Sequence, residues 1–247
     1  MFNRQEAKSR AKVSMRANYW KTVLVAFVLF AIIGSGAATF NSSASTGIGN
    51  YEAKYDVEFE DENPSKLEVF IDSLGRGLFF ALFFAILSVL VFGSLFAFAL
   101  DIFVFNPLEV GCRKFMLDNT EVPAGLMNLL YGFDHDYMRN VKAIFRRDLY
   151  LFLWSLLFII PGIVKHYSYL CVPYLIIEHP EMNGKQAIEE SRRMMNGHKM
   201  EAFILDLSFI LWLIASALTL GIVGVLYVNP YMAGAHAEFY KQIKIEG

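Results

Sequence analysis

Uncharged apolar runs of different lengths follow one another along the chain. Residues 22–40 and 77–100 contain no charged side chain. Each run has roughly the 20 residues that an α-helix needs to cross a hydrocarbon core about 30 Å thick. The pattern therefore predicts two membrane-spanning helices in the first hundred residues.

The later apolar runs fit hairpins of short helices. Residues 149–164 and 166–177 are separated by Lys165, and the first of these runs contains Pro161-Gly162 close to its end. Residues 207–235 hold no charge, are too long for one untilted helix and carry two glycines near their middle. Proline and glycine both favour turns. Two hairpins, added to the first two helices, predict six short transmembrane helices.

Charge orients these helices. The segment before the first apolar run has one acidic residue, Glu6, among six basic ones, Arg4, Lys8, Arg10, Lys12, Arg16 and Lys21. Residues 41–75 carry eight acidic and two basic side chains. Because basic residues collect on the cytoplasmic side of a membrane, both termini are expected inside and loop 41–75 outside.

A signal peptide is the alternative explanation of the N-terminus. Small residues from Gly34 to Ala38 resemble a cleavage site after a basic start and an apolar stretch. The basic start is unusually long and the apolar stretch has the length of an anchor, so an uncleaved anchor is expected.

An internal repeat links the hairpins. Asp148-Leu149 and Trp154 recur as Asp206-Leu207 and Trp212, and Asn106-Pro107 recurs as Asn229-Pro230, each pair followed by glycine at the same spacing. The repeat predicts one membrane domain, residues 1–247, built from three units at about 2–118, 123–180 and 184–246. Such units build either a transport path or an inert bundle.

The polar segments between the apolar runs are predicted to form amphipathic helices. After Asn183, small or apolar side chains recur at helical spacing at Ala187, Ser191 and Met195. Such a stripe lies either at the lipid headgroups or against the protein's own bundle. Packing on the bundle is favoured, because lipid-binding helices usually present larger apolar residues.

Composition agrees with an all-α, polytopic membrane bundle. Of 247 residues, 55% are apolar and 19% charged, and the mean hydropathy is +0.40, which excludes an ordinary soluble domain, a disordered chain and a disulfide scaffold. A net charge of −2 gives no reason to expect nucleic-acid binding. Cys112 and Cys171 lie toward the reducing side and need not pair. No cofactor-binding motif is present.

Three carboxylates lie near the cytoplasmic ends of the predicted helices: Asp101, Asp148 and Asp206. An ionisable group within a membrane is a functional candidate, because its burial is costly. In one interpretation the three carboxylates lie close together and bind a cation, a proton or the amine of a lipid headgroup. In the other, favoured for Asp148 and Asp206, the carboxylates stabilise the positive ends of their helices, with Arg146 or Arg147 as counterion.

Three further residues are candidates for ligand binding. Lys165 and His166 follow the Pro161-Gly162 turn. In one interpretation they bind a phosphate or carboxylate at an outer mouth, and in the other, which is favoured, they are polar residues of a hairpin tip that are simply hydrated. Pro173 is a candidate helix kink that frees carbonyl groups for a ligand. The two Asn-Pro pairs are read as an asparagine cap followed by the first helical residue.

A metal site is not expected. Asp134-His135-Asp136 superficially suggests metal ligation. Neighbouring side chains point in different directions, however, and no second cluster has ligand spacing, so a turn before a helix at Tyr137 is favoured.

Four motifs carry a family resemblance: Asn106-Pro107-Leu108-Glu109-Val110-Gly111, Phe158-Ile159-Ile160-Pro161-Gly162, Met194-Met195-Asn196-Gly197-His198-Lys199 and Leu205-Asp206-Leu207-Ser208-Phe209. Together they resemble the bacterial domain-of-unknown-function family nine-seven-five over nearly the whole chain. The resemblance implies a multi-pass protein of the bacterial cytoplasmic membrane. That family is distantly similar to the membrane domain of glycerophosphodiester phosphodiesterases, which implies a lipid or envelope context without the enzyme activity.

Three functions remain. The leading hypothesis is a non-enzymatic envelope protein that handles or responds to a lipid or membrane-active peptide, with membrane lipids as its surroundings. A small transporter or channel subunit, with a polar path from the carboxylates to Lys165, is the alternative. A membrane-embedded enzyme comes third, because the sequence does not place a nucleophile, a base and an orienting group together.

Overall fold

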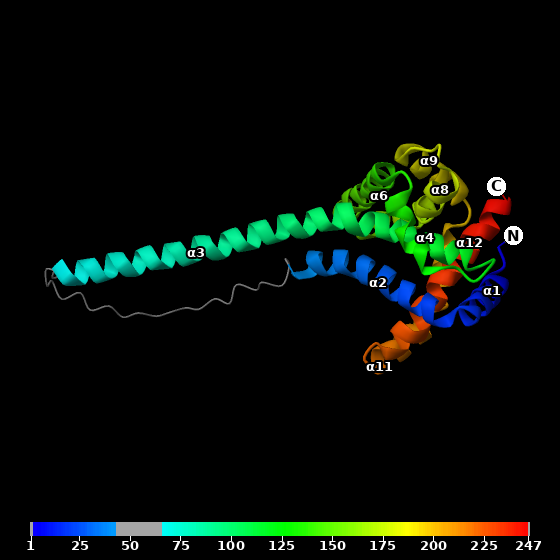
Figure 1. Cartoon of the computed structure of the whole chain (residues 1–247), viewed down its shortest axis with the longest axis horizontal. Coiled ribbons are helices and arrows are strands. Elements are labelled where there is room, and N and C mark those ends of the chain that lie inside the picture. The colour runs from blue at the N-terminus through cyan, green and yellow to red at the C-terminus, as the bar shows by residue number, and fades with distance from the viewer. Residues whose placement is uncertain (1, 43–65, 247) are drawn as a thin grey trace. The chain divides into compact units, whose positions relative to one another are not determined.

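The computed structural model describes residues 2–42 and 66–246, in which every regular element is helical (Figure 1). The elements are α1 (Arg4–Ala17), α2 (Tyr19–Ser42), α3 (Lys66–Leu100), the π-helical turn η1 (Asp101–Phe105), α4 (Asn106–Asp118), the 3-10 helix η2 (Leu126–Leu130), α5 (Tyr131–Asp134), α6 (Tyr137–Leu157), α7 (Ile159–Ser168), α8 (Val172–Glu178), α9 (Gly184–Met194), α10 (Lys199–Leu207), α11 (Ile210–Leu218), the π-helical turn η3 (Gly224–Val228) and α12 (Asn229–Glu246).

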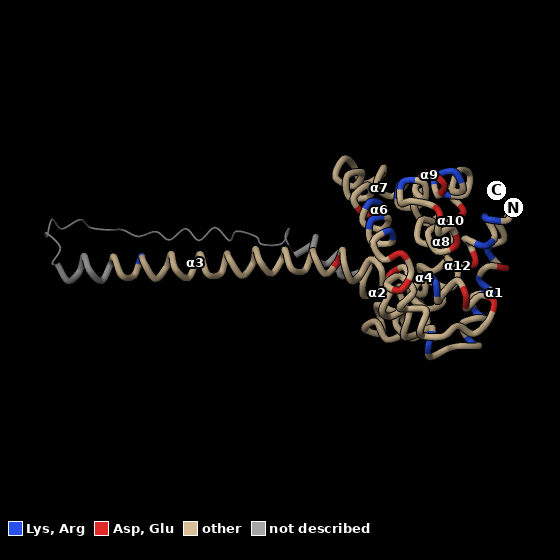
Figure 2. Tube along the Cα trace, turned by 45° about the horizontal axis from the view of Figure 1, so that its top comes forward, with Lys and Arg blue, Asp and Glu red and all other residues tan. Residues whose placement is uncertain are grey.

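Contacts divide the chain into two units. One unit combines Met1–Ala37 with Asp101–Gly247, and the other is Ala38–Leu100. In the second unit α3 is a continuous helix whose side chains from residue 73 to residue 98 are exposed. Between residues 73 and 100 Arg76 is the one charged residue, and the coloured part of this tube is almost entirely tan (Figure 2). Most of the acidic loop predicted at 41–75 lies outside the described residues.

Two stretches of the described chain are long and apolar enough to cross a membrane: Ser73–Asp118 and Lys199–Leu218. A third is added if Arg4–Ala17 and Tyr19–Ile33, bent by 112° relative to each other, form one broken span. Six transmembrane helices are therefore not confirmed. The ten residues of α7 extend only about 15 Å, half of a hydrocarbon core.

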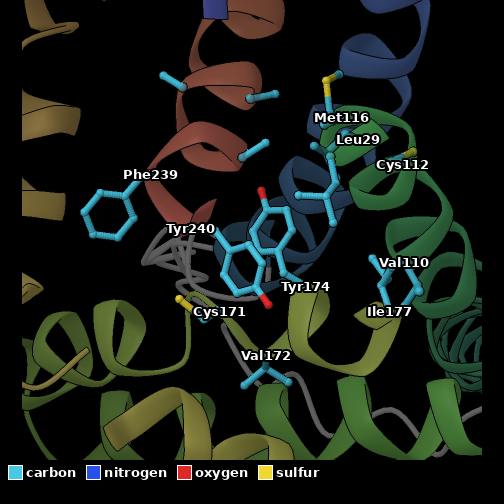
Figure 3. Close-up of a cluster of buried hydrophobic side chains, with 14 of the residues drawn as sticks. Leu29, Val110, Cys112, Met116, Cys171, Val172, Tyr174, Ile177, Phe239 and Tyr240 are labelled. Carbon is cyan, nitrogen blue, oxygen red and sulfur yellow. The ribbon is translucent and has the colours of Figure 1, made fainter. Parts of the chain in front are cut away.

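The core of the first unit lies where α4, α8 and α12 meet. Tyr174 of α8 stacks on Tyr240 of α12 at 4.9 Å between ring centroids (Figure 3). Residues Val172 to Ile177 are all buried. The prediction that 166–177 forms one of six short membrane-spanning helices is therefore not confirmed, because a short, wholly apolar segment can be covered by protein instead of lipid.

The amphipathic segment after Asn183 packs against the protein, as predicted. Ala187, Ser191 and Met195 are fully buried, and the Ser191 hydroxyl donates to the Ser168 carbonyl at 2.9 Å. The Asn183 side chain caps α9. The stripe is therefore part of the core.

The first hairpin turns at another residue than predicted, whereas the second turns at one of the two glycines near the middle of its apolar run. α6 ends at Leu157, and Phe158 is extended, so Pro161-Gly162 lies in the first turn of α7. Proline suits that position because the first N–H groups of a helix have no intrahelical partner. The second hairpin turns near Leu220 and Gly221, which have φ of 51° and 86°.

A buried amide pair holds the bend between α1 and α2. Asn18 Nδ2 donates to Asn119 Oδ1 and to the Ala124 carbonyl, both at 2.8 Å. Asn119 Nδ2 in turn donates to the Ser14 carbonyl at 3.1 Å. Buried amides need such partners, so these bonds fasten the bend to the segment that follows α4.

Both Asn-Pro pairs follow π-helical turns. Pro107 and Pro230 cannot donate to the carbonyls four residues earlier, those of Phe103 and Leu226. The Tyr137 hydroxyl donates to the Phe103 carbonyl at 2.7 Å, and the Tyr19 hydroxyl donates to the Leu226 carbonyl at 2.9 Å.

The asparagines preceding these prolines differ from the expected caps. Asn106 opens α4 without a side-chain cap hydrogen bond, since the chain enters from a helical turn. Pro107, however, does lie in the first turn of α4.

Replacing Tyr137 by phenylalanine is expected to lower the free energy of unfolding by about 0.5–1.5 kcal/mol, the contribution of one hydrogen bond. A thiol-reactive dye reports unfolding in detergent, because both cysteines, Cys112 and Cys171, are free and buried. Tyr227→Phe is the matched control, since no described group hydrogen-bonds to the Tyr227 hydroxyl. Equal midpoints for the two variants would contradict the assignment.

Candidate functional site

A bidentate ion pair joins α4 to α6. Arg147 Nη1 and Nη2 donate to the two carboxylate oxygens of Glu109 at 2.9 and 2.7 Å. The Glu109 side chain is 5% exposed and that of Arg147 13%. Paired charged hydrogen bonds of this kind are both strong and directional, so the pair sets the relative position of the two helices.

Further groups extend this pair into a network. Arg147 Nε donates to Asp148 Oδ1 at 2.8 Å. On the other side, Arg113 Nε lies 3.7 Å from Glu109 Oε1, and Arg113 Nη1 donates to the Tyr174 hydroxyl at 3.2 Å. Asp148 therefore has Arg147 as its counterion, one of the two arginines considered from the sequence.

Asp101 lies beside this network without joining its hydrogen bonds. It is within electrostatic reach of Glu109 and Arg147, and no described donor makes a hydrogen bond to its carboxylate. With Asp101 ionised, three carboxylates face two arginines. In that state the carboxylates outnumber the arginines by one.

Asp206 has a different set of partners. Its two carboxylate oxygens contact His236 Nε2 at 2.6 Å and the Tyr167 hydroxyl at 3.0 Å. His166 lies within electrostatic reach of both Asp206 and Arg147. The three predicted carboxylates thus do not share one binding point.

Pro173 and the Asp-His-Asp motif have structural positions. Pro173 lies in the first turn of α8 and is buried, so it starts a helix and does not kink one. Asp136 has a left-handed backbone and precedes α6 at Tyr137, as the turn interpretation predicts. No group of three metal-ligating side chains gathers anywhere in the described residues.

A pocket of about 520 Å³ opens between α6, α7 and α9. Its lining is mainly aromatic and aliphatic, with two cations: Tyr150, Leu153, Trp154, Leu157, Lys165, Tyr169 and Arg192. Lys165 Nζ lies 4.5 Å above the centre of the Trp154 ring, which attracts a cation to its face. The indole thus helps to hold the ammonium in the pocket.

Positive charge collects at this pocket without acidic partners. Arg192 and Lys199 are close enough to Lys165 to repel its charge. None of the three makes an ion pair with a described carboxylate, whereas the neighbouring Arg193 pairs with Glu190 at 2.6 Å. Arg146 is one turn before Tyr150 on the same face of α6. The pocket therefore combines an apolar wall with cations that have no anion.

The position of Lys165 differs from the prediction. It was expected directly after a hairpin tip, but the tip is at Phe158 and Lys165 shares a pocket with Arg192. Because α6 and α7 are antiparallel, the later residues of α7 return alongside the last two turns of α6.

Several residues and pairings of these sites were missed from the sequence alone, among them the pairing of Arg147 with Glu109. Glu109 and Arg113 are four residues apart on one helix. This spacing favours an ion pair, so their pairing could have been predicted from the sequence. Arg147, His236 and Arg192 join their partners across different helices, and no local pattern indicates those pairs.

Comparisons with known proteins give one match. A family described as "Protein of unknown function (DUF975)" matches residues 52–246. No curated protein and no solved structure matches the chain. A similarity to glycerophosphodiester phosphodiesterases stays a prediction.

Proposed function

Because the chain belongs to the DUF975 family, a family of unknown function, we propose its function from its own residues: it binds an anionic amphiphile in the pocket between α6, α7 and α9. The observation that carries the proposal is the meeting of an apolar wall with Lys165 and Arg192 in one pocket. An acyl chain fits the apolar wall, and a phosphate or carboxylate fits the two cations.

The wall and the cations occupy adjoining parts of the pocket. Leu153 and Leu157 follow each other along α6 toward the hairpin tip and are half or more exposed. Apolar side chains that remain exposed in a polar-rimmed pocket favour an apolar ligand. Lys165 and Arg192 supply N–H donors for the headgroup, and charged hydrogen bonds of this type are the strong ones.

The same geometry suits a protein embedded in a bilayer. α7 is too short to cross the membrane, so we take α6 and α7 as a re-entrant hairpin whose tip dips into lipid. The end of the hairpin away from this tip then lies at the depth of the lipid headgroups, where Lys165 and Arg192 contact phosphates. Binding in this way requires no catalytic group, in keeping with a non-enzymatic envelope protein.

A transporter is the less favoured function. It needs a polar path from Asp101, Asp148 or Asp206 to Lys165. Asp148 and Asp206 instead hold Arg147 and His236 at hydrogen-bond distance, which explains both carboxylates as structural partners.

The test uses the fluorescence of Trp154 in the full chain after Trp20 and Trp212 are replaced by phenylalanine. Dihexanoyl phosphatidic acid, added to protein in a nonionic detergent, is expected to change the emission saturably, because an anion draws Lys165 away from the indole. Dihexanoyl phosphatidylcholine is expected to bind more weakly.

Removing the two cations is expected to abolish this preference. Lys165→Gln combined with Arg192→Gln should weaken phosphatidic acid binding by about tenfold or more, the loss of at least one charged hydrogen bond. The affinity of this variant is measured by calorimetric titration, because it lacks the ammonium whose displacement changes the Trp154 emission. Arg193→Gln is the matched control, because Arg193 is paired with Glu190. Equal binding of both lipids, or an unchanged affinity in the double variant, would refute the proposal.

A further inference from the structure

A second cleft, of about 430 Å³, lies between α1, α12 and the segment that follows α4. Its lining includes the buried Glu238 of α12 and the exposed Val13 and Val122. Neither the ion-pair network nor the amphiphile pocket includes these residues.

Glu238 is a buried carboxylate without a hydrogen bond. The residue is 2% exposed, and its Oε2 atom has no hydrogen-bond partner among the described residues. The nearest cation is Arg10, whose Nη1 lies 3.7 Å away and whose side chain is 57% exposed. Arg10 is also 3.8 Å from Glu6. Because a buried carboxylate without donors is costly, a ligand donor that displaces Arg10 and reaches the covered Oε2 atom would satisfy this acceptor.

Apart from the two cations, Arg10 and Lys241, the other polar groups of the cleft also present acceptors. The hydroxyls of Ser9, Ser14 and Thr120 each donate to the carbonyl three residues earlier, at 2.9, 3.1 and 2.6 Å. Each hydroxyl has one proton, so only its lone pairs remain for a ligand. Lys241 donates to Thr120 Oγ1 at 3.1 Å and to Glu121 Oε1 at 2.8 Å. A complementary ligand must therefore bring its own donors.

We propose that this cleft binds a primary alkylammonium group, with the ammonium on Glu238 and the alkyl chain against Val13 and Val122. An ammonium has three donors and no acceptor, which matches the acceptors of the cleft. Arg10 lies beyond hydrogen-bond distance of Glu238, so a ligand that displaces it breaks no hydrogen bond between them. The group can come from a free amine, a lysine side chain or an ethanolamine headgroup.

Ionisation of Glu238 controls this binding. Burial raises the pKa of Glu238, and Arg10 and Lys241 oppose that rise, while Glu6 and Glu121 reinforce it. Lys241 holds the pKa of Glu121 below its usual range, so Glu121 stays ionised. Affinity for an ammonium is thus expected to increase as the pH rises through the raised pKa of Glu238.

Calorimetric titration of the full chain in nonionic detergent tests the site with cadaverine, N-acetyl-lysine amide and dihexanoyl phosphatidylethanolamine. Binding of any one of these supports the site and identifies the source of the amine. Butyrate, which has no ammonium donors, is expected not to bind. Failure of all three amines would overturn the proposal.

Two variants separate ligand binding from a structural role. Glu238→Gln keeps the shape and is expected to weaken amine binding by about tenfold or more. Arg10→Ala removes the competing cation and is expected to tighten binding. An unchanged or weaker affinity in Arg10→Ala, with the unfolding midpoint preserved, would contradict the proposal. Neither result depends on the amphiphile pocket, whose lipid titration is a separate measurement.

Discussion

Replacing Glu109 by alanine is expected to destabilise the protein by about 3–5 kcal/mol, because it breaks the buried bidentate pair with Arg147 and removes the carboxylate next to Arg113, while Asp148 keeps its contact with Arg147. Glu109 receives two hydrogen bonds from Arg147 and lies 3.7 Å from Arg113. With the carboxylate removed, two mostly buried guanidinium groups face each other across α4 and α6.

The measurement is the unfolding midpoint in detergent, read from the reactivity of the buried Cys112 and Cys171. Glu121→Ala is the control: Glu121 pairs with Lys241 at 2.8 Å, but its side chain is 70% exposed, and such surface pairs contribute about 0–1 kcal/mol. Adding Arg147→Gln to Glu109→Ala is expected to restore part of the lost stability. The second substitution removes a charge that the first has deprived of its bidentate partner, so the effects of the two mutations are coupled. A Glu109 variant as stable as the Glu121 variant would contradict this account of the network.

Replacing Gly111 by alanine is expected to cause the second large loss of stability. A Cβ atom there would lie 2.0 Å from the carbonyl oxygen of Leu129, so the backbone of η2 would have to move away from α4. Overpacking of a close contact costs typically about 1–3 kcal/mol and occasionally more. The effect is expected at the upper end, because the obstructing atom belongs to the backbone and has no rotamer to change.

Gly93 of α3 provides the matched helical control, since nothing lies within 4 Å of a Cβ built there. Gly93→Ala is expected to be neutral or stabilising, as alanine is the better helix former by about 1 kcal/mol. Gly132→Ala should behave like Gly111→Ala, because its Cβ would meet the Pro107 carbonyl at 2.0 Å. Equal unfolding midpoints for Gly111→Ala and Gly93→Ala would show that α4 does not pack against η2 in this way.

These two predictions give a structural explanation for a motif that the sequence alone could not explain. In Asn106-Pro107-Leu108-Glu109-Val110-Gly111, proline opens α4, glutamate holds α6 through Arg147, and glycine allows contact with η2. The sequence marks the positions and their residue types. Their partners lie 18 or more residues further along the chain, so no local spacing identifies them.

Predictions of helices succeeded where a long run admits one solution. Residues 77–100 form part of α3, as a long uncharged run requires. Residues 166–177 were ambiguous, because lipid and protein both cover an apolar surface. The structure resolves this run into the end of α7 and the buried α8. The turn at Phe158 was missed for a similar reason, since proline fits the first turn of a helix as well as a loop.

The sequence by itself determined that the described chain is helical, that it contains apolar stretches of membrane-spanning length and that its α9 segment packs by one face. These properties depend on periodicity and run length, which each segment carries within itself. Only the tertiary structure decided that Glu109 pairs with Arg147, that Asp206 pairs with His236 and that Lys165 shares a pocket with Arg192. Side chains on separate helices meet according to how those helices pack, and packing depends on the whole chain at once.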